Sequence, residues 1–178
     1  MNELILINKE YDYQQKLEIV SYIISKIIPL LLNELKLNFS PNIVIREINI
    51  DGVIGLFQYM KYEEYKNMKI DKFIINGHEE TILINNNIHL ISINTSFIEK
   101  LFSIFNEYDI KRMIILVLSH EIRHFWQFHN CLFGKQWNYK DETDDIDIKL
   151  YNESGIEKDA NNFANYFIKK YEIEIINI

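Results

Sequence analysis

Two histidines and a glutamate stand close together in residues 113–128, which read MIILVLSHEIRHFWQF. His120 and His124 are four residues apart, so on a helix both imidazoles project from the same face. Two neutral imidazole nitrogens on one face can hold one metal ion, and Glu121 lies where its carboxylate can reach a water on that ion. The pattern predicts a catalytic metal centre.

This HExxH motif also has an interpretation without a metal. His120 and His124 could be core histidines, with Glu121 in a salt bridge to Arg123 or to a nearby lysine. The preceding residues 113–118 form a continuous apolar run, which indicates a helix buried around much of its circumference. Ionisable groups at the end of such a run are unfavourable unless something compensates them, and a metal ion would do so.

A catalytic zinc ion normally has three protein ligands, so a third must come from elsewhere in the chain. The metzincin extension would need a glycine and a histidine where the chain has Gln127 and Asn130. The acidic residues in 141–147 are another source, but solvated acidic loops are common and no glycine-centred calcium loop accompanies them. The remaining candidate is Glu157, in ESGIEKDANNFA, with Glu153 as a rival one helical turn earlier.

Residues 113–128 and 153–168 together resemble the gluzincin metallopeptidases, in which the third zinc ligand opens a Glu-x-x-Ala or Glu-x-x-Ser step on a second helix. The ImmA/IrrE-like proteins and the small minigluzincins are the most similar in appearance. The resemblance implies one zinc ion per chain with three protein ligands, His120, His124 and Glu157. It also implies that Glu121 is the catalytic carboxylate.

Other residues of the expected site follow from these positions. Asn161 lies one turn after Glu157, where its side chain can accept a hydrogen bond from the far nitrogen of a ligating histidine. Glu157 has a structural alternative, because Ser154 and Glu157 also have the spacing of a helix capping box. The resemblance further implies that the strand around residues 89–94 forms the rim of the cleft, where an extended peptide adds by main-chain hydrogen bonds.

Two functions from different classes fit these residues. The first is a zinc-dependent metalloendopeptidase, a hydrolase in which Glu121 takes a proton from water and passes it to the leaving amine of a protein or peptide substrate. Its oxyanion donor stays open among three residues, Tyr139, Tyr151 and His129. The second is a non-catalytic or latent zinc-binding protein with a regulatory or protein-interaction role. A fourth zinc ligand would close its site, or the strand-prone C-terminal residues 171–178, YEIEIINI, would cover it.

The helices that must carry these residues are visible in the apolar spacing. Residues 15–37 predict a long helix that backs a sheet, with a kink or break at Pro29. Asp109 is the expected N-cap of the active-site helix, over residues 110–133, and residues 154–171 form the C-terminal glutamate helix. A short helix over 97–105, capped by Thr95 or Ser96, precedes them.

Strand signals lie between the first helix and these later ones. Residues 42–50 and 53–59 alternate on either side of Asp51-Gly52, which predicts a hairpin. Further strand-like segments lie at 73–75 and within 81–94. The expected fold class is α+β, with a small mixed or antiparallel β-sheet backed by the N-terminal helix.

Composition sets limits on partners and compartment. The length predicts a single domain over residues 1–178, which the resemblance implies is metallopeptidase-like, and the oligomeric state stays open. The net charge is −7 and the 19 basic residues are scattered, so we expect no nucleic-acid partner. Cys131 is the only cysteine, so a four-cysteine zinc module is excluded. The most apolar stretch, 17–39, is too interrupted to span a membrane, and the first residues do not read as a signal peptide, so we expect a cytoplasmic protein.

Overall fold

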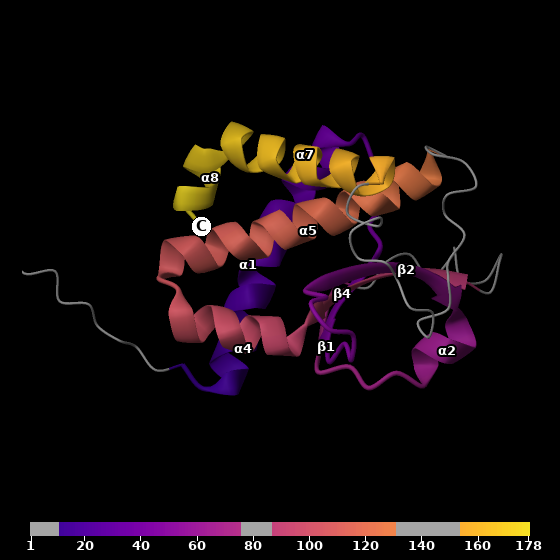
Figure 1. Cartoon of the computed structure of the whole chain (residues 1–178), viewed down its shortest axis with the longest axis horizontal. Helices are drawn as coiled ribbons and strands as arrows, with labels where there is room; N and C mark the ends of the chain where they lie inside the picture. Colours follow the sequence, from indigo (N-terminus) through magenta and orange to yellow (C-terminus); the bar gives the residue numbers. More distant parts are fainter. Residues whose placement is uncertain (1–10, 76–86, 131–153) are drawn as a thin grey trace, which may run out of the picture.

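The computed structural model describes residues 11–75, 87–130 and 154–178. A small sheet lies on one side of a long central helix, α5 (Glu107–His129), and other helices surround that helix (Figure 1). The expected α+β class is therefore confirmed, and the sheet is mixed.

The sheet has four strands in the order β2-β4-β1-β3. They are β1 (Asn42–Arg46), β2 (Gly55–Lys61), β3 (Lys72–Ile75) and β4 (Asn87–Asn94). β4 runs parallel to β1 and antiparallel to β2, and β3 is antiparallel to β1. The predicted strand at 73–75 is confirmed, whereas the residues 81–84 of another expected strand segment lie outside the described part of the chain.

The predicted hairpin across Asp51-Gly52 is wrong, because β1 and β2 are not neighbours in the sheet. β4 lies between them and pairs with both. β4 is eight residues long and every residue from Ile88 to Asn94 is buried, so this most apolar strand takes the central place, where both of its faces and both of its edges are covered. The chain turns at Gly52, whose φ is +77°, but the turn leads away from β1.

This topology also corrects the expected rim of the cleft. Residues 89–94 belong to β4, which is hydrogen-bonded on both sides and offers no open edge to a peptide. Within the described residues, β2 is the edge strand on the α5 side of the sheet. α2 (Tyr62–Lys66) follows β2 directly and packs near the opposite face of the sheet, where Val44 and Leu90 form a small second core.

α1 (Tyr13–Glu34) forms the expected long N-terminal helix and starts at a capping box between Asp12 and Gln15. Pro29 lies inside it, and the predicted break there is wrong. Burial of Ile28 and Leu31 on either side of the proline offsets the hydrogen bond that proline cannot make. The buried face of α1 packs against α5 and the sheet.

The helices after the sheet begin at asparagine caps. α4 (Thr95–Ile104) starts after Asn94, whose side chain accepts a hydrogen bond from the Ser96 backbone N–H. The N-cap is therefore Asn94, and the predicted cap at Thr95 or Ser96 is wrong. α5 starts after Asn106 rather than Asp109, and Asp109 donates its backbone N–H to the Asn106 side chain. In both cases an amide oxygen one to three residues earlier takes the capping role that we assigned to a hydroxyl or carboxylate.

The C-terminal part is helical throughout. α7 (Gly155–Lys170) begins at Ser154, and α8 (Glu172–Ile176) follows it. The expected strand at 171–178 is therefore wrong. The Tyr108 hydroxyl donates to Glu172 at 3.4 Å, so α8 lies against the start of α5, about 18 Å along the helix from His120. Among the described residues, no helix is long and apolar enough to cross a membrane.

Candidate metal centre

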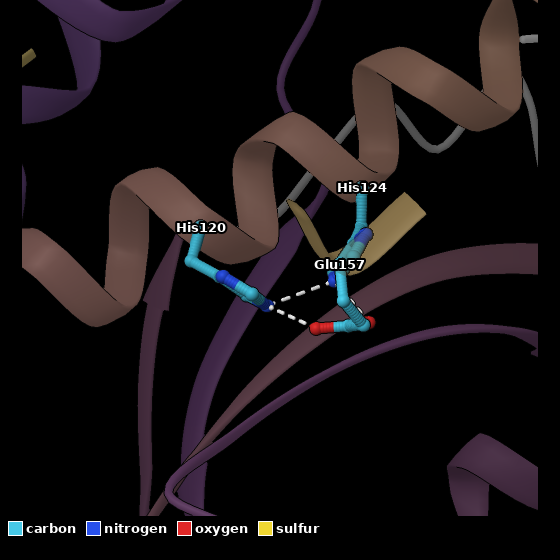
Figure 2. A group of neighbouring side chains, drawn as sticks. All are labelled: His120, His124 and Glu157. Carbon is cyan, nitrogen blue, oxygen red and sulfur yellow. Dashed lines mark hydrogen bonds and ion pairs between the residues drawn. The ribbon is translucent and has the colours of Figure 1, made fainter. Parts of the chain in front are cut away.

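His120 and His124 project from one face of α5 toward the first turn of α7, where Glu157 stands (Figure 2). The Nε2 atoms of the two histidines are 2.9 Å apart. Glu157 Oε2 lies 3.2 Å from His120 Nε2, and Glu157 Oε1 lies 3.1 Å from His124 Nε2. One nitrogen or oxygen atom from each residue therefore converges on a common point, and these atoms all lie within 4.8 Å of one another.

Local sequence explains why the two helices meet here. The opposite face of α5 is filled by core residues such as Leu118, Ile122 and Phe125, which are fully buried. α7 approaches closely because Ala160 and Ala164 face its partner with small side chains, both almost completely buried. Ser154 caps α7 by accepting the Glu157 backbone N–H at 3.3 Å, so the capping role and the place in the cluster occur together.

The cluster is enclosed and carries a buried negative charge. The side chains of Glu157 and His124 are 5% and 6% exposed, and that of His120 is 19% exposed. Burial opposes protonation of His124, but the hydrogen bond that its ring donates to Glu157 and the charges of Glu121 and Glu157 outweigh it and raise the pKa of His124. A site that draws a proton onto a buried imidazole in this way also favours a bound cation.

Glu121 lies beside the cluster, on the side of the edge strand β2. Burial raises the pKa of Glu121, and the charge of Glu157 adds to this, while His120, His124 and a hydrogen bond from the Phe57 backbone act in the opposite direction. The carboxylate is held close to β2: a Cβ atom at Gly55 would lie 2.8 Å from Glu121 Oε1 and 2.6 Å from Val117 Cγ1. Gly55 therefore leaves the space that the Glu121 carboxylate occupies.

Each histidine makes a second contact through its other ring nitrogen. His120 Nδ1 lies 3.1 Å from Asn161 Oδ1, the contact expected for Asn161. His124 Nδ1 lies 2.9 Å from Oε1 of Gln127, a residue for which the motif analysis indicated no role. Arg123 pairs with Asp159 at 2.7 Å, so the alternative in which it neutralises Glu121 is wrong.

The donor set fits a transition-metal ion. Two imidazole nitrogens and one carboxylate oxygen are a known ligand set for catalytic zinc, and the hydrogen bonds to the far ring nitrogens hold such ligands in place. In the part of the chain that the structure describes, this is the one group of three such side chains that could hold a metal. The structure thus provides a potential metal site.

Other candidates can be placed only in part. Tyr139, Tyr151, Glu153 and the acidic segment 141–147 lie outside the described residues. His129 is the exposed last residue of α5, and its ring packs against His89 and Phe39.

Sequence reasoning missed two residues of this region. Gln127 is three residues after His124 and so shares its helix face. This spacing could have indicated a contact, but it occurs in every helix and does not single out Gln127. Gly55 carries no local signal, because its contact with Glu121 joins residues far apart in the chain.

No family model matches this chain, and no curated protein or solved structure matches it either. The resemblance to gluzincins therefore depends on the motif residues themselves.

Proposed function

We propose that this protein is a zinc-dependent metalloendopeptidase that hydrolyses peptide bonds. The observation that carries the proposal is the convergence of His120, His124 and Glu157 on one point, with Glu121 buried directly beside it. The proposed cofactor is one zinc ion per chain, and the proposed partner is a protein or peptide substrate.

The site residues would have two roles, metal binding and proton transfer. His120, His124 and Glu157 would hold the ion. Bound zinc supplies Lewis acidity, which polarises a carbonyl and lowers the pKa of water from 15.7 to about 7. Glu121 would accept the proton of the attacking water and deliver it to the leaving amine, a role that its raised pKa favours because the carboxylate is a stronger base than an ordinary glutamate.

Substrate binding is proposed at the open edge of β2. An extended peptide that pairs with this edge would run beside Gly55 and Phe57, where the Glu121 carboxylate lies against the strand and accepts a hydrogen bond from the Phe57 backbone. The main-chain hydrogen bonds of such pairing are indifferent to side-chain identity, so this edge would align peptides and would not select a particular sequence.

Two features favour an enzyme over a zinc-binding protein without activity. The described residues bring three ligands together and not four, whereas closed structural zinc sites have four protein ligands. In addition, the C-terminal α8 packs at the start of α5 and not over the cluster, which argues against that segment as a cover of the site.

The test compares wild type with Glu121→Gln. The variant keeps the size of the side chain and all three ligands, so we expect it to retain one zinc per chain by elemental analysis and to lose about 10²- to 10⁴-fold of the rate on an unfolded protein substrate. Glu107→Gln, an exposed glutamate on the same helix, is the matched control and should cleave as wild type does.

The possible results separate the two functions. Wild type that holds zinc but cleaves no member of a peptide library would support the non-catalytic alternative. Equal rates for wild type and Glu121→Gln would remove Glu121 from the mechanism.

A further inference from the structure

Gln127 is fully buried between α5 and the start of α7, and every polar atom of its side chain is used. Its Oε1 lies 2.9 Å from His124 Nδ1. Its Nε2 donates to the Ile156 carbonyl oxygen at 3.0 Å and to Asp159 Oδ2 at 2.7 Å. One amide thus joins a candidate metal ligand on α5 to the turn of α7 that carries Glu157.

The partners of the Gln127 nitrogen fix which way the amide faces. A carbonyl oxygen accepts only, and so does an ionised carboxylate. The Asp159 carboxylate accepts from Arg123 at both of its oxygens, so it presents acceptors and no donor to Gln127. With two acceptors on the α7 side, the NH₂ group of Gln127 must face α7 and its oxygen must face His124.

The orientation of Gln127 in turn decides the tautomer of His124. An amide oxygen cannot donate, so the hydrogen in the contact between Gln127 and His124 belongs to His124 Nδ1. A neutral ring with its hydrogen on Nδ1 keeps its lone pair on Nε2. That Nε2 atom lies 3.1 Å from Glu157 Oε1 and 2.9 Å from His120 Nε2, at the point where the three ligand atoms converge.

Asp159 is itself held in place from α5. Arg123 donates to its two carboxylate oxygens at 2.7 Å and 3.1 Å. The guanidinium also lies over the Trp126 ring, 3.9 Å from the ring centre. The bidentate hydrogen bond to Asp159 and the stacking on Trp126 both restrict Arg123. The Asp159 carboxylate that orients Gln127 therefore has a fixed position.

We infer that Gln127 and Asp159 are positioning residues, which act in series to hold the Nε2 lone pair of His124 toward the metal position. The inference rests on the proposed function, in which His124 is a metal ligand. Asp159 acts through Gln127, so a change at Asp159 alters the ring of His124 without removing a contact to it.

The decisive variant is Asp159→Asn. An asparagine offers one acceptor oxygen where the carboxylate offers two, so Arg123 and Gln127 compete for it and the Gln127 amide is held less firmly. The Ile156 carbonyl oxygen still favours the original orientation of the amide, so we expect the hydrogen of the neutral ring to move to Nε2 in part of the molecules. Two-bond ¹H–¹⁵N spectra of the metal-free, ¹⁵N-histidine-labelled protein at pH 9 report this tautomer directly, with His89, which lies outside the cluster, as an internal reference that should not change.

Metal affinity supplies the second readout. Loss of an outer hydrogen-bond partner of a metal-ligating histidine typically costs about 10- to 100-fold in affinity, and we expect a loss of that size for zinc with Asp159→Asn. Asp159→Glu retains an acceptor carboxylate and is the matched conservative variant, which should keep the wild-type tautomer and restore most of the affinity. Gln127→Met removes the amide at similar volume and should give the same two changes as Asp159→Asn. Thermal unfolding shows whether each variant is folded.

The outcomes distinguish this inference from the proposed function. If wild type binds zinc and folded Asp159→Asn and Gln127→Met keep both the Nδ1–H tautomer and the zinc affinity, the inference is wrong and the proposed function stands. If wild type binds no zinc, the proposed function fails, and the tautomer spectra still decide whether Asp159 controls the ring.

Discussion

Two pairs of histidines involve the second half of α5: His120 and His124 are both on the helix, whereas His129 of the helix pairs with His89 of β4. The surroundings of the two pairs are opposite. The ring centres of His120 and His124 are 4.5 Å apart, and those of His89 and His129 are 4.6 Å apart. The first pair faces Glu157 and two side-chain amide oxygens. The second pair packs among aromatic rings, those of Phe39, Phe57, Tyr59, Phe125 and Phe128.

These surroundings have opposite effects on charge. The carboxylates near His124 raise its pKa against the effect of burial. Burial and the neighbouring His129 lower the pKa of His89 to about 4, and its buried Nε2 has no hydrogen-bond partner among the described residues. Proximity of two imidazoles is therefore not enough for a cation site. A buried carboxylate and acceptors for the far ring nitrogens make the difference.

Removing the Glu157 carboxylate should take from His120 and His124 the feature that distinguishes them from His89 and His129. The resulting loss of zinc affinity is the largest effect we expect. Glu157→Ala takes away a proposed direct ligand, so zinc affinity should fall by more than about 100-fold, which is the upper end of the loss typical for outer hydrogen-bond partners of a ligand. Elemental analysis after gel filtration measures it. Glu153→Ala is the matched control, because Glu153 is the rival ligand from the sequence. Full zinc in Glu157→Ala together with loss of zinc in Glu153→Ala would reverse the assignment.

The aromatic surroundings of His89 predict a loss of stability in acid. Because the pKa of His89 in the folded protein, about 4, lies below its ordinary value of 6.5, the contribution of the neutral ring is complete above about pH 6.5 and is lost as the pH falls toward 4. Linkage gives a loss of about 2 kcal/mol in the free energy of unfolding between pH 7 and pH 5. Urea unfolding of the metal-free protein measures this loss, and His89→Phe should show a pH dependence smaller by that amount. An unchanged slope in the variant would show that other groups cause it.

The carboxylate surroundings of His124 predict that zinc binding weakens in acid. The raised pKa means that a proton competes with the metal for this ring, so below that pKa the apparent zinc affinity should fall by up to about tenfold for each pH unit. Competition with a chromophoric chelator at pH 8 and pH 6, calibrated at each pH, measures the change. His89→Phe should give the same dependence, since the second pair takes no part. An affinity that does not vary with pH would mean that His124 carries no competing proton.

The smallest expected effect concerns the contact within the aromatic pair. His129 is the second cause of the lowered pKa of His89, after burial. His129→Asn should therefore raise the pKa of His89 only slightly and leave it well below 6.5. An NMR titration of the His89 ring measures the shift. A return of the His89 pKa to its ordinary value would show that His129, and not burial, dominates.

The sequence predicted the residues of the candidate site better than it predicted the sheet. The four-residue spacing of the histidines and the Glu-x-x-Ala-Asn phrase are local patterns, and helix geometry converts them directly into shared faces. Strand order depends on which segments meet across long stretches of chain. For that reason Asp51-Gly52 suggested a hairpin, while burial of β4 on both sides separated β1 from β2.

By itself the sequence determined the fold class, the two helices that carry the motif and the set of residues able to bind a metal. Only the tertiary structure decided that β2 is an edge strand of the described sheet and lies beside Glu121, that Gln127 orients His124, and that the His89 ring lies among aromatic side chains. The physical reason is range. Residues three or four apart on a helix are neighbours in every fold, whereas hydrogen bonds and charges between α5, α7 and β2 arise only when the whole core packs.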